Sequence, residues 1–269
     1  MPKPERIVSL VPSTTETLFA LGAGDQVVGV TRFCLHPGEA RTRARVVGGT
    51  KNPRLPTVLS LDPDLVLANQ EENRKEDVEN LRERVPVQVF YPRDVSEAVS
   101  DIRSLGSLLG VPERAAALAE EIESARGALT TGERGPFRCL YFIWRRPYMV
   151  AGPDTFIEAL LAEAGFLNAA PRNRGRYPEM GIDEVAASGA EVLLLSSEPY
   201  PFEEKHRAEL VSALGRGEYP GANVLLVDGE LLSWHGARLR RGLPYLSSLA
   251  EMVSSSKSAS ARPFPDPSP

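Results

Sequence analysis

Aromatic and imidazole side chains gather in the segments that directly follow the apolar runs of this sequence. Trp144 ends the run Phe137–Trp144, Trp234 precedes His235, and His36 follows another such run. Aromatic rings can stack on a flat ligand, and imidazoles can bind a metal ion. A single loop tryptophan is more often a hydrophobic plug, and a single surface histidine usually has no special role. Together, however, these residues indicate a ligand site with aromatic walls, where His36 and His235 could meet a metal.

Polar side chains occupy the same segments and extend the candidate set. "PSTTE" follows the first apolar run and could hold an anion at a helix N-terminus, although a plain helix cap is the favoured interpretation. Arginines next to the aromatic residues could pair with carboxylates of a ligand. The full set expected to bind ligand is Ser13, Thr14, His36, Asn69, Trp144, Arg145, Tyr148, Tyr177, Trp234, His235 and Arg238.

Motifs of the common enzyme classes are missing from the sequence. It contains no G-x-S-x-G elbow, no phosphate-binding G-x-x-x-x-G-K-[ST] loop, no G-x-G-x-x-G and no H-E-x-x-H. No His or Lys lies at a spacing that would indicate a catalytic partner for the acidic pairs Glu71-Glu72 and Glu203-Glu204. We therefore interpret these acids as solvated surface residues. Cys34 and Cys139 belong to no C-x-x-C pattern, which predicts unbridged thiols and no zinc site. We therefore expect a binding protein with no resident metal or cofactor.

Composition places the chain among ordinary globular proteins. It has 269 residues, of which 42% are hydrophobic and 25% charged, and a net charge of -5. The negative charge disfavours nucleic acid as a partner, and no apolar run reaches the roughly 18 residues of a membrane span. The N-terminal segment lacks the long apolar centre of a signal peptide. This predicts either a cytoplasmic protein or an exported one whose signal is not part of this sequence.

The elements that must position these residues form two similar halves. "RIVSLVPSTTETLFALGAGDQVVGVT" reads as strand, helix and strand, which predicts a parallel sheet flanked by helices. "FRCLYFIW" and the segments after it repeat this order of elements. Apolar residues at helical spacing fill the region between the halves, with one break near Gly110-Val111-Pro112. Helix caps are expected from Ser13 or Thr14 in the first half and from Asp154 or Thr155 in the second.

The predicted fold class is therefore α/β, with two similar lobes of parallel sheet joined by one long connector helix and a ligand cleft between the lobes. The expected boundaries are 1–95 for the N-terminal lobe, 96–134 for the connector, 135–253 for the C-terminal lobe and 254–269 for a disordered tail rich in Ser and Pro. Ligands of open α/β sheets bind at the carboxyl ends of strands, so the segments after the strands should line the cleft.

The order of these motifs resembles a known family. "RIVSLVPSTTETLFALGAGDQVVGVT", "CLHP", "LSLDPDLVLA", "MVAGPDTFIEALLAEAGFLN", "RYPEMGIDEVAASGAEVLLLSSEP" and "SWHGARLRRGLPYL" are similar to segments of the substrate-binding proteins of ABC importers for cobalamin and siderophores. These proteins have a helical backbone between two lobes. The likeness spans nearly the whole chain and is greatest to vitamin B12 binders of the BtuF type.

The resemblance implies a monomeric clamp that delivers a cobalamin-type corrinoid to a membrane permease with its ATPase, in the periplasm or another extracytoplasmic space. By motif position, His36 stands where the family often has Tyr, and Tyr177 where it has Trp. Asn69 replaces an expected aromatic residue and Ser233 an acidic one, so a different corrinoid, haem or a ferric siderophore is an alternative ligand. A cytoplasmic corrinoid-handling protein on the same scaffold is a further alternative. The residues expected to dock onto the permease are Glu72, Glu76, Asp183 and Glu184.

Overall fold

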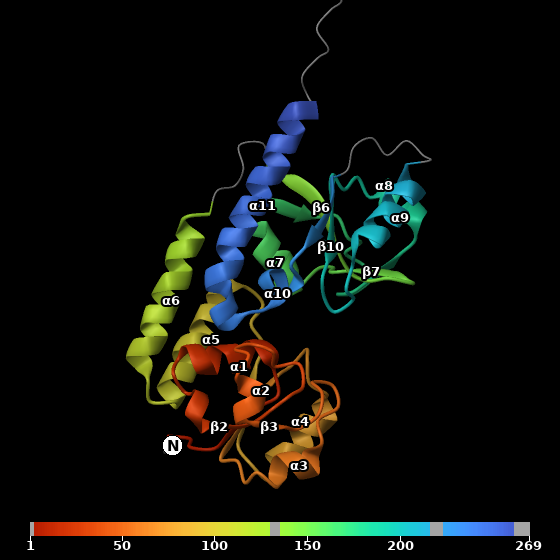
Figure 1. The fold of residues 1–269 in the computed structure, drawn as a ribbon. Coiled ribbons are helices and arrows are strands. Elements are labelled where there is room, and N and C mark those ends of the chain that lie inside the picture. Colours follow the sequence, from red (N-terminus) through yellow and green to blue (C-terminus); the bar gives the residue numbers. More distant parts are fainter. Residues whose placement is uncertain (1–2, 130–134, 216–222, 261–269) are drawn as a thin grey trace, which may run out of the picture. The chain divides into compact units, whose positions relative to one another are not determined.

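The computed structural model describes residues 3–129, 135–215 and 223–260, and the side chains of residues 256–260 are not described. The chain divides into two compact units. Unit 1 comprises Met1–Ser124 and Trp234–Arg240, and unit 2 comprises Ala125–Ser233 and Arg241–Pro269. Each unit is an α/β fold with its own sheet (Figure 1).

The described part of unit 1 has a sheet in which every paired strand is parallel to its neighbour. The order is β3-β2-β1-β4-β5. The strands are β1 (Ile7–Ser9), β2 (Val27–Val30), β3 (Arg45–Val46), β4 (Leu65–Asn69) and β5 (Val87–Phe90). The central strands β1 and β4 are buried along their whole length. Helices on both faces of a parallel sheet cause this burial, which explains the apolar runs in the sequence.

The helices of unit 1 include those predicted after the first strand and between the two halves, together with others. They are α1 (Pro12–Ala20), α2 (Ala40–Arg43), α3 (Leu55–Leu59), α4 (Lys75–Arg82), α5 (Val95–Leu108) and α6 (Pro112–Gly127), with 3₁₀ turns η1 (Gly24–Gln26) and η2 (Gly236–Arg238). Helix α1 begins at Pro12, whose fixed φ suits the first helical position. Ser13 and Thr14 lie inside the helix, and no side chain caps it. The cap expected from them is therefore wrong.

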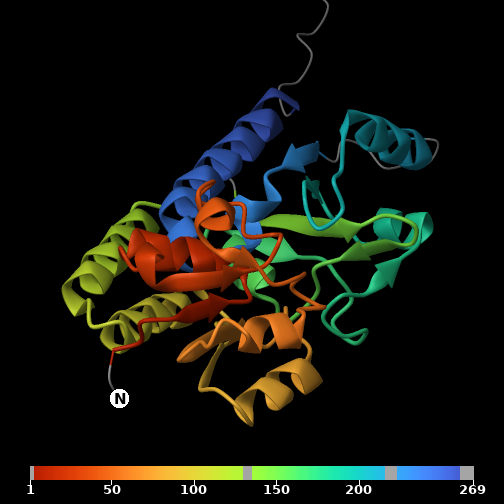
Figure 2. The same cartoon turned by 60° about the horizontal axis from the view of Figure 1, so that its bottom comes forward.

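The helical segment expected over residues 96–134 consists of two helices, α5 and α6. They are separated at the predicted break, where Gly110 has φ 67° and Pro112 starts α6. Asp94 caps α5 by accepting a hydrogen bond from the N–H of Glu97 at 2.8 Å. The two helices lie side by side (Figure 2) and leave no room for a side chain at Gly106, because a Cβ there would lie 2.1 Å from that of Ala115. Residues 130–134 lie outside the described residues.

The sheet of unit 2 is mixed. Its order is β11-β10-β6-β7-β9, and β8 also pairs with β6. The strands are β6 (Phe137–Trp144), β7 (Tyr148–Val150), β8 (Phe166–Asn168), β9 (Glu179–Met180), β10 (Val192–Ser196) and β11 (Asn223–Val227). Strand β7 runs antiparallel to β6 and β9, whereas the sequence predicts a parallel sheet. The reason is the short turn 145–147, because a parallel crossover needs a dozen or more residues.

The helices of unit 2 are α7 (Phe156–Ala162), α8 (Ile182–Ala187), α9 (Glu204–Leu214), α10 (Gly229–Ser233) and most of α11 (Leu239–Ser260). Thr155, one of the two predicted caps, caps α7 by accepting from the N–H of Glu158 at 3.2 Å. Helix α11 continues to Ser260, so residues 254–260, expected in the tail, are helical. Residues 261–269 lie outside the described residues. None of the described helices is both long enough and apolar enough to cross a membrane.

Candidate ligand-binding site

The carboxyl ends of the strands in unit 1 carry several of the polar residues identified in the sequence. Ser13 and Thr14 follow β1 in the first turn of α1, and both are buried. Asn69 is the last residue of β4 and is also buried. Parallel strands end at the same edge of a sheet, which is where open α/β sheets bind ligands. The sheet therefore brings these three residues to one edge of unit 1.

The segment Trp234–Arg240 belongs to unit 1, whereas the sequence predicts it as part of the second lobe. Contacts with α1 hold it there. The N–H of Ala237 donates to Thr17 Oγ1 at 3.0 Å. Gly236 has φ 78°, and a Cβ at this position would lie 2.3 Å from Thr17 Oγ1. Only glycine allows this close approach, so Gly236 brings Trp234 and His235 to unit 1.

Hydrogen bonds around His235 determine its tautomer. Asn69 Oδ1 accepts from the backbone N–H groups of Glu71 at 2.8 Å and of half-buried Glu72 at 3.2 Å. The group that lies 3.2 Å from His235 Nε2 is therefore the amide Nδ2 of Asn69, which can only donate. Ser13 Oγ lies 3.4 Å from the same nitrogen. Nε2 is consequently an acceptor, and the neutral ring carries its proton on Nδ1.

Desolvation lowers the pKa of His235 from 6.5 to about 4. Between these pH values the unfolded chain binds more protons at this residue than the folded protein does. The contribution of His235 to the free energy of unfolding is therefore fully present above pH 6.5 and is lost as the pH falls towards 4. We expect His235→Gln to reduce the loss of stability across this range, measured by urea denaturation at several pH values. His36→Gln is the matched control, and an unchanged slope in His235→Gln would contradict the neutral assignment.

The indole of Trp234 is ordered by two other side chains of unit 1. The guanidinium of Arg238 lies 4.9 Å from the ring centroid. The ring of His36 meets the indole edge-on, with centroids 5.8 Å apart and an interplanar angle of 70°. Arg238 is buried, and its Nε donates to Glu16 Oε2 at 2.8 Å. This ion pair holds the cation against the ring, where the two attract each other.

His36 and His235 lie in the same unit, whereas the sequence analysis expected them from opposite halves. In the part of the chain that the structure describes, no group of three or more His, Cys, Asp or Glu residues could hold a metal ion. One imidazole can nevertheless serve as an axial ligand to the metal of a bound macrocycle. The lone pair of His235 Nε2 already accepts from Asn69.

Trp144 stands at the carboxyl end of β6 and is 42% exposed. Its ring meets that of Tyr200 edge-on, with centroids 5.6 Å apart and an interplanar angle of 70°. The hydroxyl of Tyr200 lies 3.2 Å from His206 Nε2, and His206 Nδ1 accepts from the N–H of Glu203 at 3.0 Å. Because Nδ1 accepts, Nε2 of a neutral His206 donates to the tyrosine oxygen. These contacts order Tyr200 against Trp144.

The other predicted residues of unit 2 differ in how much surface they offer. Tyr148 packs edge-on against buried Phe142, with centroids 5.6 Å apart, so its ring joins the core. Tyr177 is 38% exposed. The side chain of Arg145 is only 11% exposed and forms an ion pair with Glu209. Trp144 and Tyr177 therefore offer most of the aromatic surface that was predicted for this unit.

Two further aromatic residues at strand ends were missing from the predicted set. Phe33 follows β2 and is 50% exposed, with the guanidinium of Arg32 5.2 Å from its ring centroid. Tyr200 follows β10 and contacts Trp144. Both lie in segments that the sequence analysis identified as strand ends. Their aromatic type at those positions was the signal that could have selected them.

An open cavity of about 560 Å³ lies beside the β6–β7 turn in unit 2. Its lining includes Arg145, Arg146, Tyr148, Glu179 and Glu184. The lining combines charged groups of both signs with apolar side chains such as Pro147, Met180 and Ile182, so the cavity offers both polar and apolar surface.

The acids expected to contact a permease differ in their surroundings. Glu184 accepts from the N–H of Gly181 at 2.8 Å and pairs with Arg174 at 2.5 Å, and both interactions lower the pKa of Glu184. Glu76 and Asp183 are exposed in the first turns of α4 and α8. Glu184 thus has a local structural role, whereas Glu76 and Asp183 present their carboxylates to solvent.

Comparison with known proteins identifies the family of this chain. A family model described as "Periplasmic binding protein" matches residues 7–212 of the chain. The chain belongs to the periplasmic binding protein family. Proteins of this family bind solutes, and membership implies an extracytoplasmic location.

Several relatives resemble this periplasmic binding protein along most of its length. A vitamin B12-binding protein of Yersinia pestis is 26% identical over 196 residues, which are 71% of this chain and 69% of that protein. The solved structure of the periplasmic heme-binding protein RhuT from Roseiflexus sp. RS-1 is 26% identical, with a TM-score of 0.78 over 93% of this chain and 99% of that one. The periplasmic vitamin B12-binding protein BtuF of Vibrio cholerae, at 19% identity, has a TM-score of 0.78 over 93% and 98% of the two chains and shares the fold.

Proposed function

We propose that this protein is the substrate-binding component of an ABC importer and that its ligand is a cobalamin-type corrinoid. The observation that carries the proposal is the exposure of large rings in segments that adjoin the strands. Phe33, Trp144 and Tyr177 are 50%, 42% and 38% exposed, respectively. On each unit, a ring exposed in this way could stack on a flat macrocycle and lose its contact with water. The vitamin B12-binding relative at 26% identity supports the same ligand class.

The polar groups of unit 1 favour a corrinoid over haem. Ser13, Asn69 and neutral His235 form one hydrogen-bonded cluster at the strand ends. Neutral donors and acceptors suit the amide side chains of a corrinoid, whereas haem carries two ionised propionates. Arg238 is paired with Glu16, so we assign it to the support of Trp234 rather than to a ligand carboxylate. The proposed ligand contacts are Ser13, Thr14, His36, Asn69, Trp144, Arg145, Tyr148, Tyr177, Trp234 and His235, with Phe33 and Tyr200 added from the structure.

Haem is the second candidate. The haem-binding relative from Roseiflexus matches 93% of the chain at 26% identity. His36, which lies against Trp234, could supply an axial imidazole. Haem bound in this way should show a shifted Soret band that is lost in His36→Ala.

A binding screen tests the function directly. The purified protein is titrated with cyanocobalamin, cobinamide, haemin and a ferric siderophore, and heat and tryptophan fluorescence are recorded. We expect both corrinoids to release heat and to quench the fluorescence of Trp144 and Trp234. A response to the siderophore alone would overturn the proposed ligand. A protein that binds corrinoids but supports no uptake with any permease would instead indicate a corrinoid-handling protein.

Substitutions on the proposed permease-contact surface should affect transport without affecting ligand binding. Exposed Glu76 and Asp183 are the proposed contacts for basic residues of the permease, with Glu72 and Glu184 less favourably placed. We expect Glu76→Lys and Asp183→Lys to leave ligand affinity unchanged and together to reduce uptake by the reconstituted importer at least tenfold, because like charges would then oppose docking. Glu79→Lys on the same helix is the matched control. Undiminished uptake by the double variant would exclude this surface.

A further inference from the structure

Asn73 lies in the turn between β4 and α4 and is 5% exposed. Its side-chain amide contacts the backbone of three segments. Nδ2 donates to the carbonyl oxygen of Thr50 at 2.9 Å and, more weakly, to that of Leu10 at 3.4 Å, and Oδ1 accepts from the N–H of Asn69 at 2.8 Å. Leu10 directly follows β1, Thr50 lies in the loop after β3, and Asn69 ends β4. One buried amide therefore joins three segments at the carboxyl ends of strands.

The neighbours of this amide fix its orientation. A backbone carbonyl group only accepts and a backbone N–H only donates, so the flipped amide would place its oxygen against two acceptors. Both protons of Nδ2 and one lone pair of Oδ1 are used within the protein. A side chain that is buried and engaged in this way supports other residues and is not itself a ligand contact. Aspartate would lack both donors, and serine has only one.

Asn69 and Asn73 form a reciprocal pair. The carbonyl oxygen of Asn69 accepts from the N–H of Asn73 at 3.0 Å, while the N–H of Asn69 donates to the Asn73 side chain. Both backbone polar groups of Asn69 thus contact Asn73. The side chain of Asn69 in turn donates to His235 Nε2 at 3.2 Å. Asn73 therefore holds the backbone from which the Asn69 side chain reaches the imidazole.

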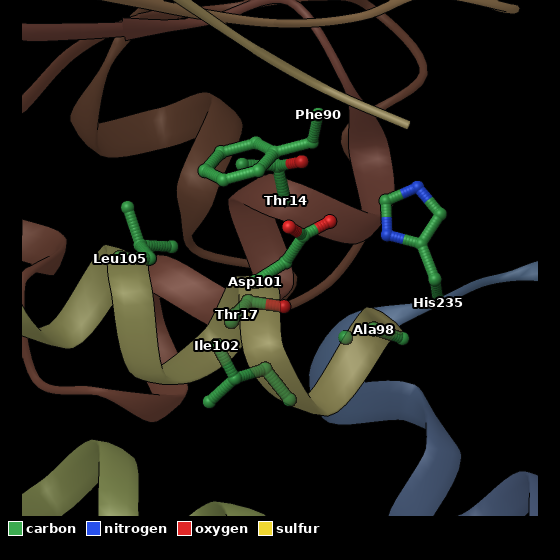
Figure 3. A pocket seen from close by; sticks show the side chains of 9 residues that line it. Thr14, Thr17, Phe90, Ala98, Asp101, Ile102, Leu105 and His235 are labelled. Atoms are coloured by element: carbon green, nitrogen blue, oxygen red, sulfur yellow. The ribbon is translucent and has the colours of Figure 1, made fainter. Parts of the chain in front are cut away.

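His235 has room to respond to a change at Asn69. Its imidazole borders a small cavity of about 20 Å³ in unit 1, which is lined mainly by α1 and α5 and has Asp101 across the space (Figure 3). Close packing normally restricts a buried ring, and an adjoining cavity relaxes this restriction. The hydrogen bond from Asn69 is therefore one of the interactions on which the position of the ring depends.

We propose that Asn73 is a positioning residue for the ligand site of unit 1 and that it acts through Asn69. Its amide ties the β4–α4 turn to the segments after β1 and β3, which keeps the Asn69 side chain directed at His235. A ligand then meets these two side chains already ordered, so less conformational entropy is lost on binding. The effect on a ligand rests on the proposed function, whereas the positioning of Asn69 and His235 does not.

Nitrogen NMR without ligand tests the positioning. We expect Asn73→Ala to shift the side-chain amide signal of Asn69 and the ring-nitrogen signals of His235 in a protein that remains folded by circular dichroism. Asn73→Ser, which keeps one donor, should shift both by less and replaces Asn73→Ala if that variant does not fold. Asn80→Ala, at an exposed position of α4, is the matched control and should shift neither. Unchanged signals in the folded Asn73 variant would overturn the proposal.

A double-mutant cycle with cyanocobalamin tests the effect on ligand binding. Asn73→Ala should weaken binding about 3- to 10-fold, the effect of about one hydrogen bond. In the Asn69→Ala background the same substitution should change the affinity by less than about twofold, because the side chain through which Asn73 acts has been removed. Urea denaturation should show a similar loss of stability from Asn73→Ala in both backgrounds, since the backbone partners of Asn73 remain in both.

The two measurements separate positioning from a general weakening of the fold. Equal fold-changes in affinity in the two backgrounds would mean that Asn73 acts on unit 1 as a whole rather than through Asn69, and would overturn the proposed route. If the wild-type protein does not bind cyanocobalamin, the proposed ligand fails, while the NMR comparison still decides whether Asn73 positions Asn69 and His235.

Discussion

Trp234→Ala should weaken corrinoid binding by about 30-fold or more while the protein remains folded. Buried aromatic anchors of an interface commonly contribute about 2 kcal/mol or more when truncated, and 1.4 kcal/mol corresponds to a factor of ten. Trp234 qualifies because Arg238 and His36 already hold its ring, so little entropy is lost when a ligand covers it. Calorimetric titration with cyanocobalamin measures the change.

Two further variants make this result interpretable. Trp234→Phe keeps an aromatic face and should retain most of the affinity. Leu167→Ala, at a residue that is 47% exposed on β8, should change neither binding nor folding. If Trp234→Ala unfolds the protein, the ring is a hydrophobic plug of unit 1 and not a ligand contact. Wild-type affinity in a folded Trp234→Ala protein would equally exclude it from the site.

Glu16→Ala should lower the free energy of unfolding by about 3–5 kcal/mol, the usual effect of removing one partner from a buried ion pair. The side chains of Glu16 and Arg238 are 13% and 3% exposed, so the variant removes one carboxylate partner of a buried guanidinium. Urea denaturation, followed by circular dichroism, measures the loss. Because Arg238 also lies against Trp234, the same variant should alter the fluorescence of that indole.

A surface ion pair supplies the control for this prediction. Arg103 and Glu123 join α5 to α6 at 3.0 Å, but their side chains are 46% and 49% exposed. Glu123→Ala should therefore cost no more than about 1 kcal/mol, because water screens the pair. The double variant Glu16→Leu with Arg238→Leu should recover much of the stability, since it removes both charges of the pair together. If Glu16→Ala lowers the free energy of unfolding no more than Glu123→Ala does, burial of the Glu16–Arg238 pair has little effect on stability.

Much of the fold could be predicted from the sequence because it depends on local patterns. The run Phe137–Trp144 is apolar and short, and the structure confirms it as β6 with the same bounds. Thr155 caps α7 because its hydroxyl reaches an N–H three residues away, a contact within one turn. The break between α5 and α6 follows from Gly110 and Pro112, whose backbone preferences are intrinsic.

The strand-end segments that make up the candidate site could likewise be found from the sequence, because strand ends and aromatic residue types are visible in it. The sequence could not show which of these segments lie together or how their side chains are protonated. Gly236 lets the Trp234–Arg240 segment pack on α1, which places His235 beside Asn69 and, across a small cavity, Asp101. These contacts join residues more than a hundred positions apart, and their distance and burial determine the tautomer of His235. The sequence by itself therefore determined the α/β elements and the strand-end segments that carry the candidate residues. Only the tertiary structure decided which of their polar groups face one another, because hydrogen bonding and desolvation depend on distances in space and not on spacing along the chain.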